Sequence, residues 1–193
     1  MAGPECRAAW TQHVWKGIAM LPDSTVGEIR ASMRREHLKD LEASLPIRWL
    51  PLAVHMDLLE AAYGALGDTR YQQFWRDRTM TSLQNPLLFG KAFKMALKTF
   101  GKSSLGILRG VPVSMRYAIR GSGELRVELE GMDQARFIHD GFPPKHSEGL
   151  TWASSWLGAL EGVMSAADQK VRVTLDKHEP AHGYFEYLVE AAG

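Results

Sequence analysis

The spacing of two histidines near the end of the chain matches a motif of zinc proteases. Residues 178–182 read H-E-x-x-H, a pattern that binds Zn²⁺ when a helix places both imidazoles on one face. Here the flanking residues alternate as strands do, Gly183 follows directly, and Pro180 would interrupt the required helix. We therefore interpret this segment as a hairpin turn, and the sequence predicts no metal site.

Other catalytic signatures are incomplete. Gly101-Lys102-Ser103 resembles the end of a phosphate-binding loop, but the full pattern needs a glycine five positions before Gly101, where this sequence has Ala96. No G-x-S-x-G segment occurs, and the single cysteine, Cys6, has no histidine beside it in the sequence. The sequence predicts no catalytic residues and no cofactor. A protein that is not an enzyme is therefore favoured.

A stripe of lysines is the most regular charge pattern in the chain. Lys91, Lys94, Lys98 and Lys102 are spaced by three or four residues, which places them on one face of a helix. Such a face is most often simply solvated, but it could also bind phosphate, an acidic lipid or an acidic protein partner. Sequence-specific nucleic-acid binding is not expected, because the pI is about 7.9 and no aromatic residue lies within the stripe.

A second candidate site consists of aromatic residues. Trp152 and Trp156 lie one helical turn apart, on the face of a predicted helix that we expect to cover a sheet. Packing in the core is the usual role of such residues. They could instead form the wall of a pocket between helix and sheet, closed by a Pro-rich loop with His139, Phe142 and His146. The ligand-binding site that the sequence predicts consists of Tyr117, His139, Phe142, Trp152 and Trp156.

The elements that would position these residues change character along the chain. Apolar residues three or four positions apart, with proline, glycine or a capping residue at the boundaries, predict helices over residues 8–21, 24–44, 51–66, 69–82, 86–100 and 103–109. After Pro112 the apolar period becomes two.

That alternation predicts strands at 115–119 and 125–129, joined by a turn at residues 121–123, and at 171–175 and 185–189. A helix over 150–166 lies between the two pairs. The predicted fold class is α+β, with a helical N-terminal half packed on an antiparallel β-β-α-β-β module.

Size and composition fit an ordinary globular chain. The 193 residues are 45% hydrophobic and 23% charged, which predicts one domain with a helical part (1–111) and a β-β-α-β-β part (112–193). The single cysteine excludes an internal disulfide, and no secretory signal or apolar span of ~20 residues is visible. We therefore expect a cytoplasmic location and no membrane span.

Charge is distributed unevenly along the chain. Residues 70–126 carry 11 Lys or Arg and 2 Asp or Glu, whereas residues 127–193 carry 5 and 11. This asymmetry could mark an anion-binding face, or the two parts could attract each other across the fold.

The last part of the sequence carries a family resemblance. Residues 152–190 resemble the end of the 4-vinyl-reductase-like ligand-binding domains, in which a G-x-x-x-G helix, here Gly158 and Gly162, precedes two strands. The whole chain also resembles an uncharacterised myxobacterial protein family, with a W-x-P-like segment at 49–51, a Gly-Asp pair at 67–68 and a Leu-x-Arg-Gly-x-Pro-like step at 108–112.

The resemblance implies a function as well as a fold. Related domains often bind small hydrophobic or tetrapyrrole-like molecules, or act as dimerising scaffolds. Many members place cysteines in the last strands, and this chain has none there, so no metal site carries over.

Three hypotheses of function follow. The first is a non-catalytic ligand-binding sensor or regulatory adaptor that holds a small apolar molecule between helix and sheet. The alternative is a protein–protein interaction or homodimerisation module that uses the lysine stripe to contact an acidic partner or its own acidic C-terminal surface. The third is an enzyme of unrecognised type.

Overall fold

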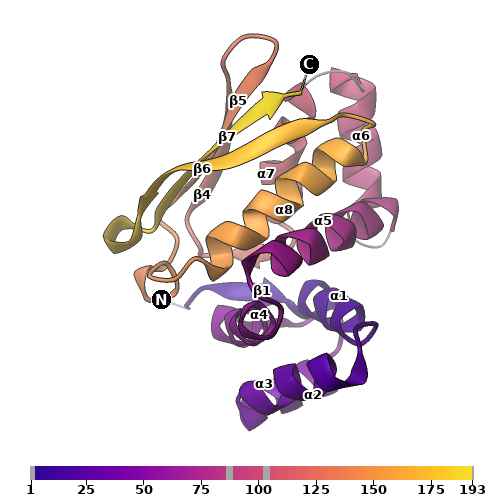
Figure 1. Cartoon of the computed structure of the whole chain (residues 1–193), viewed down its shortest axis with the longest axis vertical. Helices are drawn as coiled ribbons and strands as arrows, with labels where there is room; N and C mark the ends of the chain where they lie inside the picture. The colour runs from indigo at the N-terminus through magenta and orange to yellow at the C-terminus, as the bar shows by residue number, and fades with distance from the viewer. Residues whose placement is uncertain (1–2, 86–88, 102–104, 193) are drawn as a thin grey trace.

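The structure is layered, with the helical N-terminal part on one side of a single long helix and a sheet on the other. The computed structural model describes residues 3–85, 89–101 and 105–192. Figure 1 shows the sheet, then α8 (Thr151–Ser165), then α5 (Asp68–Gln84), and then the first helices of the chain. The predicted α+β class is confirmed.

Helices occupy most of the first half, as the apolar periodicity predicts. Their bounds are α1 (Ala8–Ile18), α2 (Asp23–Ser32), α3 (Arg35–Ala43), α4 (Leu52–Leu66), α5, α6 (Gly90–Phe100), a 3-10 turn (Leu105–Arg109) and α7 (Gly110–Met115). Pro51 directly precedes α4, where a missing N–H costs nothing, and Gly67, with φ 70°, separates α4 from α5. The predicted starts at residues 86 and 103 lie outside the described residues.

The prediction of a single helix over 24–44 is wrong, because the helix is interrupted at Met33 and continues as a second helix, α3. Met33 is extended (φ −71°, ψ 147°) and buried. The backbone N–H of Arg34 then donates to Asp57 Oδ2 of α4 at 2.8 Å, and His37 Nδ1 lies 3.0 Å from the same oxygen. A carboxylate from another helix thus stabilises the positive end of α3, which no local sequence pattern reveals.

The predicted β-β-α-β-β order of the second half is confirmed. The elements are β4 (Glu124–Leu129), β5 (Gln134–Asp140), α8, β6 (Val171–Glu179) and β7 (Tyr184–Ala191), and the antiparallel sheet has the order β4-β5-β7-β6. On the face that α8 covers, Phe137, Tyr187 and Val189 are fully buried.

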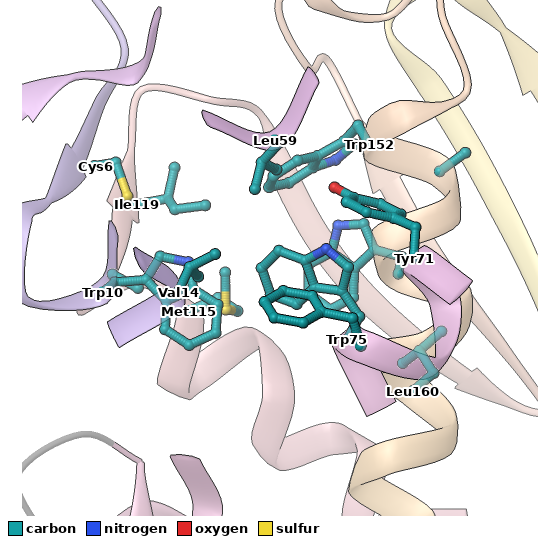
Figure 2. Close-up of a cluster of buried hydrophobic side chains, with 14 of the residues drawn as sticks. Cys6, Trp10, Val14, Leu59, Tyr71, Trp75, Met115, Ile119, Trp152 and Leu160 are labelled. Atoms are coloured by element: carbon teal, nitrogen blue, oxygen red, sulfur yellow. The ribbon is translucent and has the colours of Figure 1, made fainter. Parts of the chain in front are cut away.

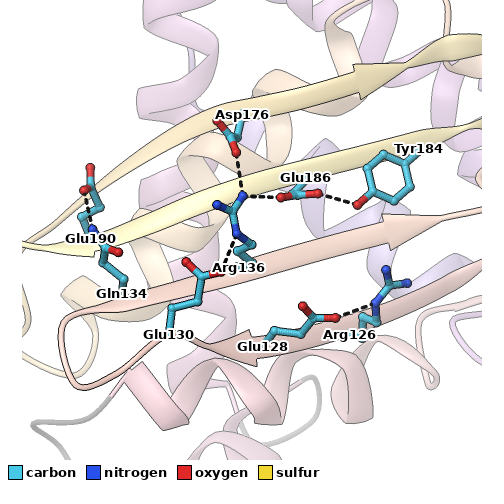
Figure 3. Close-up of polar contacts among 9 residues, drawn as sticks. All are labelled: Arg126, Glu128, Glu130, Gln134, Arg136, Asp176, Tyr184, Glu186 and Glu190. Atoms are coloured by element: carbon cyan, nitrogen blue, oxygen red, sulfur yellow. Dashed lines mark hydrogen bonds and ion pairs between the residues drawn. The ribbon is translucent and has the colours of Figure 1, made fainter.

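The opposite face of the sheet is polar (Figure 3). Arg136 pairs with Glu130 at 2.7 Å and Asp176 at 2.6 Å, and also with Glu186 on the neighbouring strand. These hydrogen bonds raise the pKa of Arg136 above its ordinary value. Much of the acidic charge of residues 127–193 is therefore already paired within the sheet.

The strand predicted at 115–119 is wrong. The segment up to Met115 belongs to α7, and β3 (Ile119–Arg120) pairs with β1 (Glu5–Arg7). β1 also pairs with β2 (Trp49–Pro51), so a small sheet of order β2-β1-β3 ties the start of the chain to its middle. The true partner of β4 is β5, with Val127 opposite Phe137, in a segment predicted as loop.

Two glycines let α8 approach α5 closely. A Cβ on Gly158 would overlap the Gln72 carbonyl oxygen, and a Cβ on Gly162 would lie 2.6 Å from the Arg76 carbonyl oxygen. The G-x-x-x-G pattern therefore serves helix packing, which holds the aromatic side chains of α8 against the N-terminal part.

The H-E-x-x-H segment forms a hairpin turn, as predicted. β6 ends at Glu179, Pro180–His182 form a 3-10 turn, and Gly183 has φ 63°. His178 stacks on Phe185 at 4.7 Å, whereas the His182 side chain is 77% exposed. Among the described residues, no three His, Cys, Asp or Glu side chains are grouped so as to hold a metal ion.

Within the described part of the chain, no helix combines the length and the apolar character that crossing a membrane requires.

Candidate ligand-binding site

Three spaces in the molecule adjoin one another, because neighbouring ones share lining residues. We call them the outer groove (about 750 Å³), the inner cavity (about 60 Å³) and the sheet-side cavity (about 200 Å³). Trp10 and Phe89 line both the groove and the inner cavity, and Met115 and Trp152 line both cavities. In Figure 2, Trp10, Met115 and Trp152, from α1, α7 and α8, gather in one buried cluster.

The outer groove has apolar walls and a basic rim. Ile47 and Tyr117 line it and are 76% and 70% exposed. Lys16 and Arg7 are the charged residues of its lining, and no Asp or Glu is among the described residues that line it. Lys16 is exposed and makes no ion pair with any residue that the structure describes. The Arg7 guanidinium lies 4.1 Å over the Trp49 ring.

A further cation, Arg78, contacts a residue of the groove lining. Arg78 Nη2 lies 2.8 Å from Nε2 of His13, a groove residue, and donates to the His13 carbonyl oxygen at 2.9 Å. Arg78 has no carboxylate partner among the described residues. Burial and the Arg78 charge lower the pKa of His13 to about 4. The imidazole is therefore neutral near pH 7, and the local field favours an anion.

Aromatic rings crowd the inner cavity. The Trp10 ring lies 6.4 Å from the His55 ring and 5.8 Å from the Trp75 ring. Four buried atoms of lining residues have no hydrogen-bond partner among the described residues: His55 Nε2, Trp75 Nε1, Thr79 Oγ1 and Trp156 Nε1. Burial lowers the pKa of His55 to about 3, so its ring is neutral.

The sheet-side cavity is lined by a histidine whose hydrogen bonds are complete. His139 Nε2 lies 2.7 Å from the Ser122 carbonyl oxygen, and Trp152 Nε1 donates to His139 Nδ1 at 3.1 Å. Burial lowers the pKa of His139 to about 4. Phe142 stacks on Trp152 at 4.5 Å and is fully buried. His139 and Trp152 therefore form part of the cavity wall, and Phe142 packs behind Trp152 in the core rather than acting as a movable lid.

The structure brings together four of the five residues of the predicted ligand site. His139, Phe142 and Trp152 are in mutual contact, and Trp156 lies next to Trp152 at 6.0 Å. Tyr117 lies apart from them, on the outer groove.

The lysine stripe is on α6, as the spacing predicts. Lys91, Lys94 and Lys98 are exposed there. Lys102 lies outside the described residues.

Several lining residues were not predicted from the sequence, among them Trp10, Lys16 and Met115. His55 carried a usable signal, because it is a lone histidine within the apolar run of α4. The others come from elements that only the tertiary fold brings together.

The chain resembles known proteins in its three-dimensional structure but not in its sequence. No family model matches the chain, and no curated protein sequence matches it. The Fe(II) unliganded H-NOX protein from K. algicida is similar at a TM-score of 0.62 and 9% identity, covering 97% of each chain. An oxygen-binding H-NOX domain related to soluble guanylate cyclases, in its oxygen complex, gives 0.61 and 12%, covering 97% of this chain and 95% of that one. A structure from a study of haem distortion in the H-NOX family gives 0.58 and 12%, covering 96% and 95%.

These matches overturn the family resemblance inferred from the sequence. The similar solved structures are H-NOX domains, not 4-vinyl-reductase-like modules, and they align along nearly the whole chain rather than with its end alone. At these identities the likeness concerns the backbone only, so what it establishes is that the chain has the H-NOX fold.

Proposed function

We propose that this chain is a non-catalytic, haem-free ligand-binding domain that takes a small organic molecule, with an apolar body and an acidic group, into the outer groove. The observation that carries the proposal is the lining of that groove. Its volume of about 750 Å³ lies within the roughly 300–1,000 Å³ of small-molecule sites. The groove has apolar walls beside Arg7 and Lys16, and no Asp or Glu is among the described residues that line it. Such a lining suits an amphipathic anion.

Haem, which the names of similar structures suggest, does not fit the residues present. Haem iron is held by His, Cys, Met or Tyr, and His55 and Met115 are residues of these types that line the inner cavity. That cavity measures about 60 Å³, far below the volume of a ligand of macrocycle size. The Trp10 ring lies 6.4 Å from the His55 ring, so no flat macrocycle can enter between them.

The outer groove does not suit haem iron either, although its volume would suffice. The described lining residues of these types are His13 and Tyr117. His13 Nε2 lies 2.8 Å from Arg78 Nη2, and Tyr117 is 70% exposed, so that a haem held by it would lie open to solvent. A guanidinium at this position repels a metal cation.

The proposal is tested with a matched pair of small ligands. 4-Phenylbutyrate carries a carboxylate, and 4-phenylbutanol has a similar body without the charge. Isothermal titration calorimetry should show the acid binding about tenfold more tightly, since a hydrogen bond to a charged group contributes about 1.5–3 kcal/mol. Lys16→Gln should remove that preference.

Lys98→Gln is the matched control, because Lys98 is an exposed lysine on α6, outside the groove lining. It should leave the preference intact. Equal affinity for acid and alcohol, or no binding of either, contradicts the proposal.

A second candidate function rests on the exposed face of α6. Lys91, Lys94 and Lys98 are exposed there, and Met95 between them is 66% exposed. A basic face with an apolar centre suits an acidic protein partner or a second copy of the chain. Reversal of Lys94 and Lys98 to Glu should abolish concentration-dependent association in sedimentation experiments. A monomer at every concentration, or association unchanged by the reversal and by salt, argues against this function.

A further inference from the structure

We infer that the edge of the outer groove is a docking face for the surface of an anionic lipid membrane. The docking face consists of residues 45–48 and Tyr117, together with Arg7 and Lys16 of the groove lining. The inference goes beyond the small-molecule site and does not depend on it, because it rests on exposed apolar side chains and on charge rather than on the volume of the groove.

Residues 45–48 form a turn that exposes large apolar side chains. The Arg48 N–H donates to the Leu45 carbonyl oxygen at 3.0 Å and closes the turn. Leu45 is 69% exposed, and Ile47 is exposed as well. Turns favour Gly, Pro, Asn, Asp and Ser, and Pro is usual at the second position. The conformation of the turn therefore accounts for Pro46 but not for the two aliphatic residues beside it.

The backbone of this turn is fixed on the rest of the fold. The carbonyl oxygens of residues 46–48 each accept a hydrogen bond from residues 7–9. The donors are, in that order, Ala9 N at 2.9 Å, Arg7 Nη1 at 2.6 Å and Ala8 N at 2.9 Å. Three bonds to one segment hold the turn in place, so the exposure of its apolar side chains is a property of the folded chain.

Tyr117 adds an aromatic ring to the same groove. It is exposed and lies in a turn that the Ala118 N–H closes on the Met115 carbonyl oxygen at 2.9 Å. The Arg7 N–H donates to the Ala118 carbonyl oxygen at 2.7 Å, so this turn and the turn at 45–48 are both anchored on the end of β1. Tyrosine is enriched at membrane–water interfaces, because its ring is apolar and its hydroxyl group can stay in water.

The cations of the docking face have no carboxylate partner among the residues that the structure describes. These cations are Arg7, Lys16 and Arg48. Glu5, the acidic residue of β1, is already paired with Arg120 at 2.5 Å. Exposed apolar side chains beside free cations are the chemistry that binds a protein to the surface of an anionic bilayer, where apolar burial and charge attraction add.

The shape of the docking face favours a membrane over a protein partner. Ile47 and Tyr117 both line a hollow of about 750 Å³ instead of forming one flat patch. A stable protein interface is packed as densely as a protein interior, so a protein partner would have to fill this hollow. Lipid headgroups are mobile and adapt to such a surface.

Vesicle sedimentation tests the inference, with no small ligand added. Vesicles of phosphatidylcholine mixed with phosphatidylserine should bind the chain at least about tenfold more tightly than phosphatidylcholine alone, since each cation near an anionic surface contributes about fivefold. Ile47→Ser should weaken binding to the mixed vesicles by about tenfold. Its side chain is exposed, so the thermal unfolding midpoint should not change.

Met132→Ser is the matched control. Met132 is 90% exposed, but it lies beside Asp133 in the segment between β4 and β5, outside the docking face. Its replacement removes an exposed apolar side chain of similar size and should leave vesicle binding unchanged.

A fluorescent label shows directly which side chain enters the lipid. Cys6 is the single cysteine and is fully buried, so a cysteine introduced on the surface can be labelled selectively with the polarity-sensitive dye NBD. The dye on Ile47→Cys should shift its emission to the blue on addition of the mixed vesicles. The dye on Met132→Cys should not respond.

Three outcomes would overturn the inference. Equal affinity for neutral and anionic vesicles means that the cations do not contribute. An unchanged emission of the dye at position 47 means that this side chain stays in water. Protein that remains in the supernatant with every vesicle means that the docking face serves a protein partner instead. None of these outcomes bears on the preference for 4-phenylbutyrate, which is measured without lipid.

Discussion

The Trp152 indole and the His139 imidazole form the hydrogen bond that joins α8 to the sheet. Trp152 Nε1 donates to His139 Nδ1 at 3.1 Å, and His139 Nε2 donates to the Ser122 carbonyl oxygen at 2.7 Å. Both side chains are buried. His139 is therefore fixed in one tautomer, and its two nitrogens are both satisfied.

Removing the indole N–H should be costly at Trp152 and cheap at Trp156. Trp152→Phe leaves His139 Nδ1 without a partner in a buried position, which costs about 1–3 kcal/mol beyond the loss of ring volume. Trp156→Phe removes the same atoms, but within the described part of the chain Trp156 Nε1 has no partner to lose. Urea unfolding of the two variants measures the difference directly. Equal losses in free energy of unfolding would show that the Trp152–His139 bond contributes nothing.

Close packing of α5 and α8 gives a second prediction. Gly158→Ala and Gly162→Ala should each destabilise the fold by roughly 1–3 kcal/mol, since the new methyl group meets backbone atoms of α5 that cannot yield. Gly64→Ala in α4 is the matched control, because nothing lies within 4 Å of its added Cβ. This control should stabilise the chain by about 0.5–1 kcal/mol. Thermal unfolding that ranks the three variants otherwise would contradict the packing.

Local sequence patterns predicted the helices well and the short strands poorly. The apolar period of α4 and α5 reflects burial of one face, which is a local property. β1 and β2 have three residues each, too few for alternation to be recognised. Residues 115–119 alternate by chance, and their conformation is set by the 3-10 turn at Leu105–Arg109, by α6 and by β1, which they contact only in the folded chain.

The candidate site was predictable only in part, for the same reason. Trp152 and Trp156 share a helix face, so their proximity follows from spacing alone. The bond between Trp152 and His139 needs β5, which was predicted as a loop. Lys16 and Tyr117 line the same groove because β1 pairs with β3. The paired residues of these two strands lie more than 100 positions apart in the sequence.

Stability should fall as the solution is acidified, because buried histidines are held neutral. The folded pKa values of His139 and His55 are about 4 and about 3, below the ordinary 6.5. Between each lowered pKa and the ordinary value of 6.5, the unfolded chain binds more protons than the folded chain. The stability that these groups contribute is therefore fully present above pH 6.5 and is lost as the pH falls through about 4 for His139 and about 3 for His55.

His139→Gln isolates one of these groups. Glutamine can still accept from Trp152 but does not titrate. The slope of unfolding free energy against pH near pH 5 should therefore decrease by about 1.4 kcal/mol per pH unit. Denaturant titrations at pH 5 and 7 measure the slope. An unchanged slope would mean that His139 protonates freely in the folded chain.

The chain should not bind haem stoichiometrically, although it has the fold of haem-associated structures. The Trp10, Trp75 and Met115 side chains occupy the space beside His55 that a macrocycle would need. Protein purified from cells supplied with a haem precursor should show no Soret absorption, and added haemin should bind no better than it binds to a His55→Leu variant. Stoichiometric haem that is lost in His55→Leu would show instead that these side chains move aside and that His55 reaches the iron.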